Sequence, residues 1–358
     1  MVTLKKFHIP GLQSKVKVAQ KIFLAQQLQI MVRAGVPLTG ALKTLQLQTT
    51  GQRLKQILND VEQNIEKGQT LAEAMRPHEH DFGQLMVNMI AAGEASGRLE
   101  EVLGQVYLQM KKDHEIISRV QGALIYPAIV VTAMFVIGTG MMIFVIPQLT
   151  AIFKESNVVL PLPTRILIST STFLQKYALF IFPAMALLIW AFAWVIRQPR
   201  GRYIWHGVLL STPIAGAIIK KVNMARFART VSSFLKTDIP IVQTLITTAD
   251  VLGNVHYREA LLEAAKRLTK GVTLSEALRD WPNLFNPTIL QMITVGEQSG
   301  ALDDILVEAA SFYEDEVAQI MTTLPSLLEP ILMLLLGVGV GAMAVAIILP
   351  LYRLTEAF

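Results

Sequence analysis

The sequence offers few residues whose types and spacing match a catalytic or metal site. It contains no cysteine, which excludes disulfides, thiolate metal ligands and cysteine nucleophiles. The segment His78-Glu79-His80 could supply metal ligands, but the matching positions of an internal repeat are Trp281-Pro282-Asn283. That difference favours a solvated loop over a metal site. No Gly-x-x-x-x-Gly-Lys-Ser/Thr element occurs, so the chain cannot bind a nucleotide through a P-loop. We therefore predict no catalytic residue, no metal and no cofactor, and a protein that is not an enzyme.

Two glutamates lie in the same short motif, Gly-Glu-x-Ser-Gly, which occurs at residues 93–97 and 296–300. Glu94 and Glu297 could act as interaction or ion-binding carboxylates. The flanking glycines favour another interpretation, in which each carboxylate holds a tight turn between a fifth and a sixth helix by accepting backbone N–H bonds. Ser96 and Ser299 precede a glycine as some nucleophiles do, but no histidine is placed to activate them. We predict that their hydroxyls are helix N-caps.

The composition indicates a membrane protein. Of 358 residues, 52% are hydrophobic and 16% charged, and the mean hydropathy is +0.46. Soluble domains carry about 25% charged residues. The net charge of +5 is better explained by cytoplasmic anchoring charges than by nucleic acid. The first long hydrophobic run lies beyond residue 120, so we expect no signal peptide.

Three uncharged segments, 128–146, 177–196 and 331–349, each have the roughly 20 residues that a bilayer requires. Basic residues precede the first segment and follow the second: Lys111, Lys112, Arg119, Arg197, Arg200, Arg202, Lys220 and Lys221. The positive-inside rule places both of these flanking regions in the cytoplasm and the intervening loop outside. The third segment then starts in the cytoplasm by parity. None of the three has a charged residue at its centre.

The two halves of the chain match at a constant offset, as from Pro37 to Pro240. Residues 68–74 match 271–277, the motif at 93–97 matches 296–300, and Tyr126-Pro127 falls on Glu329-Pro330. The register therefore holds through a polar module and the span attached to it. The prolines at these span entrances could bend the long sixth helix.

Helical periodicity and punctuation predict six helices in each module. In the first copy they cover about residues 16–34, a stretch beginning at Pro37, 52–67, 70–77, 82–96 and a sixth after Gly97. Thr70-x-x-Glu73 and Thr273-x-x-Glu276 predict capping boxes. The predicted fold is all-α, a polytopic membrane protein with two duplicated cytoplasmic six-helix bundles and three transmembrane helices. The expected divisions are an N-terminal segment 1–15, module 1 at 16–122, a span at 123–147, an external loop at 148–172, a span at 173–196, module 2 at 197–325, a span at 326–350 and an external tail at 351–358.

Sixteen motif residues are the candidate interaction or structural site: Gly35, Pro37, Gly68, Thr70, Glu73, Gly93, Glu94, Gly97, Asp238, Pro240, Gly271, Thr273, Glu276, Gly296, Glu297 and Gly300. Gly337 and Gly341 form a small-residue face in the third span, suited to packing within the monomer or against another helix. Lys111-Lys112 aligns with Glu314-Asp315, which reverses the charge before the spans. Either these stretches face different partners or each other, or they are ordinary solvated helix faces.

The elements Gly35-Val36-Pro37-Leu38, Gly68-x-Thr70-Leu71 and Gly93-Glu94-x-Ser96-Gly97-x-Leu99 resemble the type II secretion system F-domain family. The resemblance covers nearly the whole chain. It implies a multi-pass inner-membrane platform of a bacterial type IV pilus or type II secretion machine. The implied partners are a cytoplasmic hexameric assembly ATPase, pilin or pseudopilin subunits, other inner-membrane assembly proteins, membrane lipid and further copies of the chain. Asp238 departs from the pattern where the first copy has Gly35, and the N-terminal extension is short for the family.

Two other classes of function compete with a platform. A transporter or channel would need a polar site at the bilayer midplane, and an intramembrane hydrolase would need a Ser/His or paired Asp arrangement there. The predicted spans offer neither. The sequence leaves open whether such a machine builds pili, takes up DNA or secretes protein, and which module binds the ATPase.

Overall fold

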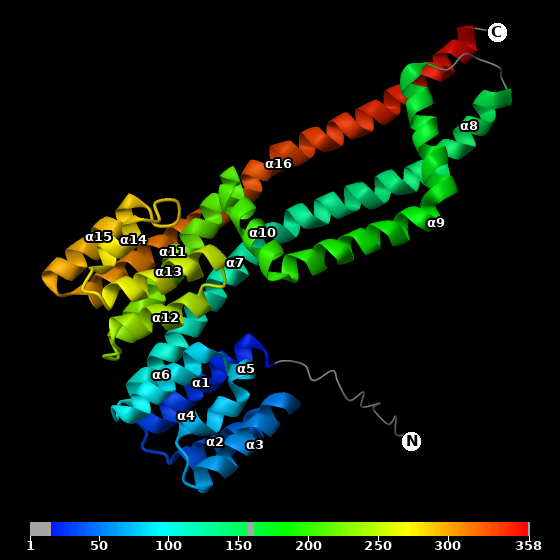
Figure 1. The fold of residues 1–358 in the computed structure, drawn as a ribbon. Helices are drawn as coiled ribbons and strands as arrows, with labels where there is room; N and C mark the ends of the chain where they lie inside the picture. Colours follow the sequence, from blue (N-terminus) through cyan, green and yellow to red (C-terminus); the bar gives the residue numbers. More distant parts are fainter. Residues whose placement is uncertain (1–15, 156–160, 357–358) are drawn as a thin grey trace, which may run out of the picture. The chain divides into compact units, whose positions relative to one another are not determined.

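The computed structural model describes residues 16–155 and 161–356, and every element in these ranges is helical. The chain divides into two compact units (Figure 1). One unit joins residues 16–117 to Leu209–Val317, and the other joins Ser118–Val208 to residues 318–356. The first unit holds both modules, and the second holds the apolar helices. The all-α fold with a repeated helical module is confirmed.

Module 1 contains the predicted helices, with bounds that differ from the sequence estimates by a few residues. They are α1 (Val18–Arg33), α2 (Leu38–Gln48), α3 (Gln52–Glu66), α4 (Leu71–Met75), α6 (Gln84–Ala95) and α7, which begins at Leu99. Between α4 and α6 lie a 3₁₀ turn, η1 (Arg76–His78), and a short helix, α5 (Glu79–Phe82). The predicted solvated loop at His78-Glu79-His80 is therefore wrong. The segment is held in the fold by Asp81 and Phe82 of α5, whose side chains are buried at 6% and 3% exposure.

Module 2 repeats this order as α11 (Pro213–Leu235), α12 (Ile241–Val251), α13 (Val255–Leu268), α14 (Leu274–Arg279), α15 (Pro287–Ser299) and α16 (Leu302–Glu356). Its core is built on aromatic rings. The Phe285 ring lies edge-on to those of Phe227 and Tyr257, with centroids 5.4 and 5.6 Å apart. The buried Tyr257 hydroxyl donates to the Leu284 carbonyl at 2.9 Å. Burial raises the pKa of Tyr257, which keeps the hydroxyl a donor.

In the described part of the chain, three helices are long and apolar enough to cross a membrane: Leu99–Thr150, Leu162–Arg197 and Leu302–Leu349. A fourth would be added if the pair Pro199–Ser211 and Pro213–Leu235, bent by 105°, formed one span. The first comprises α7 (Leu99–Gly140), a π-helical turn η2 (Met141–Val145) and the start of α8 (Ile146–Glu155), and the second is α9. The segment 148–172, assigned to an external loop from sequence, is helical to Glu155 and again from Leu162, and residues 156–160 lie outside the described ranges. A further helix, α10 (Pro199–Ser211), precedes module 2.

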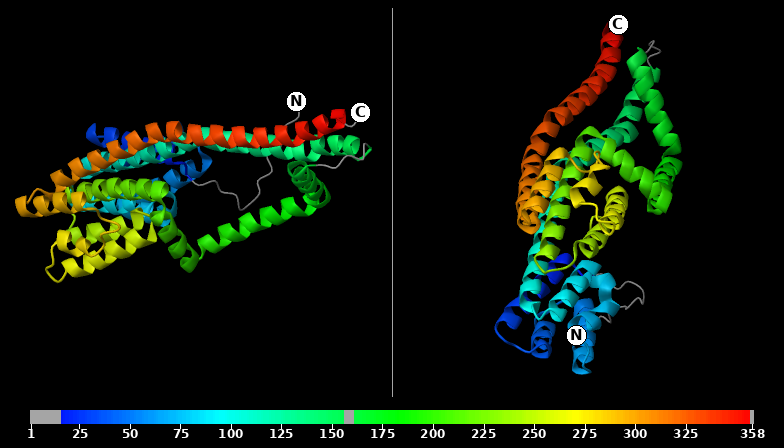
Figure 2. Two further views of the ribbon diagram at one scale, coloured as in Figure 1. Left: turned by 90° about the horizontal axis from the view of Figure 1, so that it is seen from above. Right: turned by 60° about the vertical axis from the view of Figure 1, so that its left-hand side comes forward.

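The sixth helix of each module continues into its span without a break. Figure 2 shows α16 as one unbroken helix, and α7 likewise passes through Pro127. In the apolar unit, side chains of α9 bond to backbone carbonyls of its neighbours. Ser171 and Gln175 donate to Met142 and Ile143 of η2 at 2.5 and 2.6 Å, and Thr164 donates to Ala346 at 2.7 Å. Carbonyls at a π-turn are available for such bonds because the helical ladder is locally displaced there.

We predict opposite effects of alanine at two helical glycines. At Gly93 of α6, a Cβ would lie 2.8 Å from the branched Cβ of Val102 in α7, so Gly93→Ala should separate these helices. At Gly40 of α2, the nearest atom is 3.7 Å away. Thermal unfolding of the full chain in detergent should show a lower midpoint for Gly93→Ala. It should show an unchanged or higher midpoint for Gly40→Ala, because alanine favours a helix interior by about 1 kcal/mol. Equal midpoints for the two variants would contradict the close approach of α6 and α7.

Candidate functional site

The first motif residues converge on the N-terminus of the five-residue helix α4. The Glu94 carboxylate, from α6, accepts the backbone N–H of Leu71 at 2.6 Å and of Ala72 at 2.7 Å, one on each oxygen. Thr70 Oγ1 accepts the N–H of Glu73 at 3.2 Å, and the Glu73 carboxylate accepts the N–H of Thr70 at 3.1 Å. Side chains therefore satisfy all the amides of the first turn, which no intrahelical carbonyl can reach. The carboxylate also carries the charge that a helix N-terminus favours.

The second copy builds the same cap on α14. Glu297 accepts the N–H groups of Leu274 at 2.5 Å and Ser275 at 3.1 Å, and also the Ser275 hydroxyl at 2.6 Å. Thr273 Oγ1 accepts the N–H of Glu276 at 3.3 Å, which is the hydroxyl half of the predicted box. Two motifs that lie more than 20 residues apart in each module thus meet at one helix end.

The turn after the Gly-Glu-x-Ser-Gly motif is held by backbone bonds instead. Gly97 has φ +70°, and the N–H of Arg98 donates to the Gly93 carbonyl at 2.8 Å. Gly300, with φ +71°, and Ala301 repeat this arrangement. Such a left-handed glycine with a six-to-one bond is a standard helix ending. The prediction that the glutamates accept backbone N–H groups agrees with the structure, but its location was wrong, because the amides belong to α4 and α14.

The serine prediction was also wrong. The Ser96 hydroxyl donates to the Ala92 carbonyl, and the Ser299 hydroxyl to the Val295 carbonyl, each at 2.8 Å. Both serines lie at the end of the preceding helix, where an acceptor is within reach, and not at the start of the next. A serine before a glycine therefore indicates a helix end here.

The remaining motif residues shape helix ends. Gly35, Gly68 and Gly271 have φ between +74° and +92° after their helices, and Pro37 and Pro240 stand directly before α2 and α12. Asp238 has φ +59°, so it adopts the conformation of its counterpart Gly35 despite the steric cost of a side chain. Its carboxylate accepts a hydrogen bond from Arg98 of module 1 at 2.6 Å. The departure from glycine therefore coincides with a contact between modules.

Charged residues of module 1 and module 2 also pair along α7. Lys112 lies 3.1 Å from Glu314, whose carboxylate also binds Arg229 at 2.8 Å. Asp113 pairs with Arg226 of α11. The interpretation in which the reversed charges face each other therefore agrees with the structure for the pair of Lys112 and Glu314. It does not describe Lys111, whose ammonium lies over the Tyr107 ring, or the exposed Asp315.

The contact between modules contains polar residues that the sequence did not single out. Gln109 of α7 is 3% exposed, donates to Thr230 at 3.0 Å and accepts from Ser233 at 3.5 Å. Phe234 of α11 belongs to the hydrophobic core of module 1, and Ile239 packs against it. The only signal for them in the sequence is that the two copies differ at these positions, as with Gln109 and Phe312.

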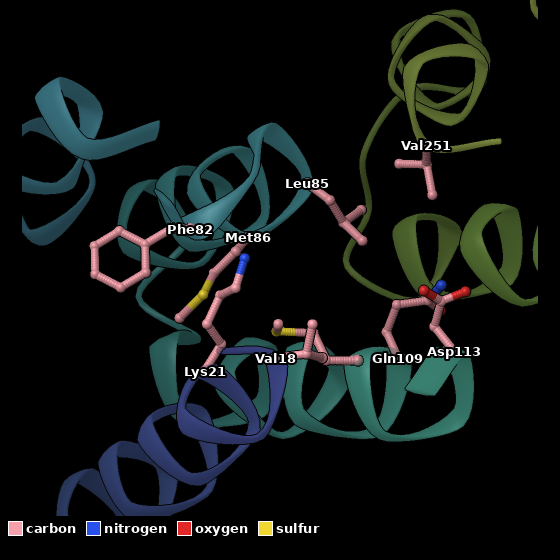
Figure 3. Close-up of a pocket in the computed structure, with 9 residues that line it drawn as sticks. Val18, Lys21, Phe82, Leu85, Met86, Gln109, Asp113 and Val251 are labelled. Atoms are coloured by element: carbon pink, nitrogen blue, oxygen red, sulfur yellow. The ribbon is translucent and has the colours of Figure 1, made fainter. Parts of the chain in front are cut away.

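Beside this contact lies a cavity of about 180 Å³ with mainly apolar lining (Figure 3). Val18, Lys21, Phe82, Leu85 and Met86 line it, together with Asp113 and, from α12, Val251. A cavity of about 210 Å³ in module 2 is lined by Lys221, Met224 and Tyr313, the counterparts of Val18, Lys21 and Met110 of the first cavity. The duplication thus repeats a recess between the first and sixth helices. The residues that line this recess differ between the two copies, so the two cavities would not bind the same kind of ligand.

Titratable residues near α5 serve the packing of module 1. Asp81 is buried and accepts from Arg53 at 2.7 Å. Burial acts to raise the pKa of Asp81, but the hydrogen bond and charge of Arg53 outweigh it and hold the pKa below its usual value. His78 lies 3.5 Å from Asp60. Among residues 16–155 and 161–356, no group of three His, Cys, Asp or Glu residues could hold a metal ion.

The two glycines of the third span take no part in this site. A Cβ placed on Gly337 or Gly341 would meet no atom within 4 Å, so nothing in the described part of the chain covers this face of α16. The proposal that it packs against another helix stays a prediction.

We predict that Glu94→Gln weakens the cap of α4. The amide side chain has one acceptor oxygen and a lower charge, so one N–H of Leu71 or Ala72 loses its partner, at a cost of about 1–3 kcal/mol. Hydrogen exchange of these two amides should accelerate and the unfolding midpoint should fall. Glu66→Gln, at the exposed end of α3, is the control and should leave both unchanged. Unaltered exchange at Leu71 and Ala72 in Glu94→Gln would rule out the carboxylate cap.

A second prediction concerns the pair of Asp113 and Arg226. Asp113→Arg and Arg226→Asp should each lower the unfolding midpoint because like charges then meet between modules. The double variant should regain about 1 kcal/mol of coupling free energy. The same exchange at the exposed pair of Glu263 and Lys266, within α13, should show almost none. Strictly additive effects at 113 and 226 would argue against direct pairing.

The comparison with protein families finds the same module twice. The sequence model of the family described as type II secretion system (T2SS), protein F matches residues 24–147 and again 227–350. Each match covers most of a module and the span that follows it, in the register expected from the duplication.

Curated relatives match over most of their length. The type IV pilus assembly protein TapC of Aeromonas hydrophila is 34% identical over 96% of this chain and 83% of its own. The type IV pilus assembly protein PilC of Thermus thermophilus is 33% identical over 97% of this chain and 85% of its own. The type II secretion system protein F of Pseudomonas aeruginosa is 31% identical, over 93% and 82%. With two matches to the family model and these relatives, the chain belongs to the type II secretion system protein F family.

Proposed function

We propose that this protein is an inner-membrane platform of a type IV pilus or type II secretion apparatus. In this role it has no catalytic activity. It receives work from a cytoplasmic assembly ATPase at its modules and delivers it to pilin or pseudopilin subunits in the membrane. The names of its relatives, pilus assembly proteins and a secretion system protein, support both kinds of machine.

One structural observation carries the coupling role. Each module ends in a helix that continues directly into a span, α7 over Leu99–Gly140 and α16 over Leu302–Glu356. A displacement of the module by a partner is then transmitted along hydrogen-bonded helix rather than lost in a loop. The buried start of α7, including Val102, Leu103 and Val106, packs this helix into its module.

The absence of nucleotide and redox motifs is consistent with a partner that supplies the energy. Leu179, Trp190 and Val338, in the spans, are 81%, 67% and 71% exposed, as expected for side chains solvated by lipid. The two glutamates of the Gly-Glu-x-Ser-Gly motifs, Glu94 and Glu297, are engaged in helix caps, where they support structure.

The continuity of α7 can be tested by replacing residues Ser118, Arg119, Val120 and Gln121 with four glycines, against a control with four alanines. Glycine weakens a helix by about 1 kcal/mol per residue relative to alanine, and both variants remove Arg119 equally. In cells that lack the native gene, we expect the alanine variant to support pilus assembly or secretion and the glycine variant to lose most of it. Both should reach the membrane and co-purify with the assembly ATPase.

Equal activity of the two variants would contradict transmission through α7. Failure of the native full chain to co-purify with the ATPase would contradict the coupling role itself. Normal pilus assembly and secretion in cells without the gene would refute the proposed function altogether.

A further inference from the structure

Within the chain the two modules meet through unlike faces. Module 2 contributes a surface around its first helix, here named the first-helix face: Arg226, Thr230, Ser233, Phe234, Asp238 and Ile239. Module 1 contributes a surface on and just before its sixth helix, here named the sixth-helix face: Arg98, Gln109 and Asp113. A contact between two different faces is heterologous. Each repeat has both a first-helix face and a sixth-helix face, and this contact uses only one of the two faces in each module.

Because the modules are repeats, each also possesses the face that this contact leaves over. The offset from Pro37 to Pro240 places the first-helix face of module 1 at Phe23, Gln27, Ile30, Met31, Gly35 and Val36. The same offset places the sixth-helix face of module 2 at Ala301, Phe312 and Glu316.

The largest side chains of these two leftover faces are apolar, and several of them are exposed. Phe23, Ile30 and Val36 are 39%, 51% and 37% exposed, whereas in the docked module Thr230, Ser233 and Phe234 are at most 5% exposed. Phe312 is 45% exposed, whereas its counterpart Gln109 is 3% exposed. All of these residues lie in the unit that holds the modules, outside the predicted spans, so lipid does not account for their exposure.

The two leftover faces also differ from the docked faces in a matched way. Asp238 on one docked face pairs with Arg98 on the other, and the corresponding leftover residues are Gly35 and Ala301, both small and uncharged.

The polar contact between Ser233 and Gln109 corresponds to Ile30 and Phe312, both large and apolar. At these two positions a change on one face is accompanied by the fitting change on the other. Thr230, the second partner of Gln109, corresponds to Gln27, which keeps a polar side chain. The pair of Arg226 and Asp113 has no such equivalent, since Lys221 of the same module holds Glu316 at 2.9 Å.

We propose that the first-helix face of module 1 docks on the sixth-helix face of module 2 in a second copy of this chain. The polar residues direct docking within a chain, and the apolar residues direct docking between chains. In the wrong contact the buried Gln109 would lose the Ser233 hydroxyl and meet Ile30 instead. Each chain offers one leftover face of each kind, so two chains can satisfy both contacts. This contact does not depend on the proposed function.

The test uses the full chain, which contains no cysteine of its own. One epitope-tagged chain carries Ile30→Cys and a differently tagged chain carries Phe312→Cys, and both are co-expressed and oxidised in membranes. We expect a disulfide-linked species at twice the 39.6 kDa chain mass that contains both tags. Each variant expressed alone should give little of this species. Leu47→Cys replaces Ile30→Cys in the control, because Leu47 is 80% exposed but outside the first-helix face.

Cross-linking of Ile30→Cys chains to each other, or equal cross-linking with Leu47→Cys, would overturn the proposal. So would the absence of any mixed species in membranes that contain both chains. A double variant with both cysteines in one chain should also form the dimeric species. A shift confined to the monomer band would mean that the faces meet within one chain, and would equally refute it.

A second measurement tests the energetics without cysteines. Ile30→Glu and Phe312→Lys should each weaken self-association of the detergent-solubilised chain about tenfold or more, as for a central apolar contact. Combined in one chain, they should restore much of the association through the new charge pair. Association unchanged by either single variant would count against these faces.

Discussion

The capping of one very short helix in each module holds the rest of the bundle together. A five-residue helix such as α4 is far below the length at which helices are stable alone. It nevertheless buries Leu71, Ala72, Ala74 and Met75 to 3% exposure or less. Its amides would lose water without gaining partners unless Glu94 and Thr70 accepted them. Since Glu94 comes from α6 and its neighbour Gly93 touches α7, the same motif joins three helices.

The duplication kept this cap and changed the surfaces. Glu94 and Glu297 make equivalent bonds, and the turns after Gly97 and Gly300 have nearly equal φ. The copies differ where modules contact each other, as at Gly35 and Asp238. There Asp238 adopts a left-handed conformation that glycine adopts without strain, and its carboxylate pairs with Arg98 of module 1. Packing inside a module tolerates little change, whereas a docking face can change if its partner changes with it.

Continuity between module and span is the second consequence of this architecture. α7 and α16 each combine a buried amphipathic part with a lipid-solvated part in one hydrogen-bonded helix. Such a helix can transmit displacement, which a flexible linker cannot. A platform built in this way can act in an energy-driven machine, provided that its partners supply and receive the work.

The sequence by itself determined the all-α fold, the repeat, the three spans and most helix ends, because hydrophobic periodicity, glycine and proline act over a few neighbouring residues. It also indicated that Glu94 and Glu297 accept backbone N–H groups. Only the tertiary structure decided that those amides belong to α4 and α14, that Asp81 and Arg53 anchor α5, and that Gln109 lies buried against Thr230 and Ser233. These contacts join residues distant in sequence, and their partners depend on how helices pack, which no local pattern records.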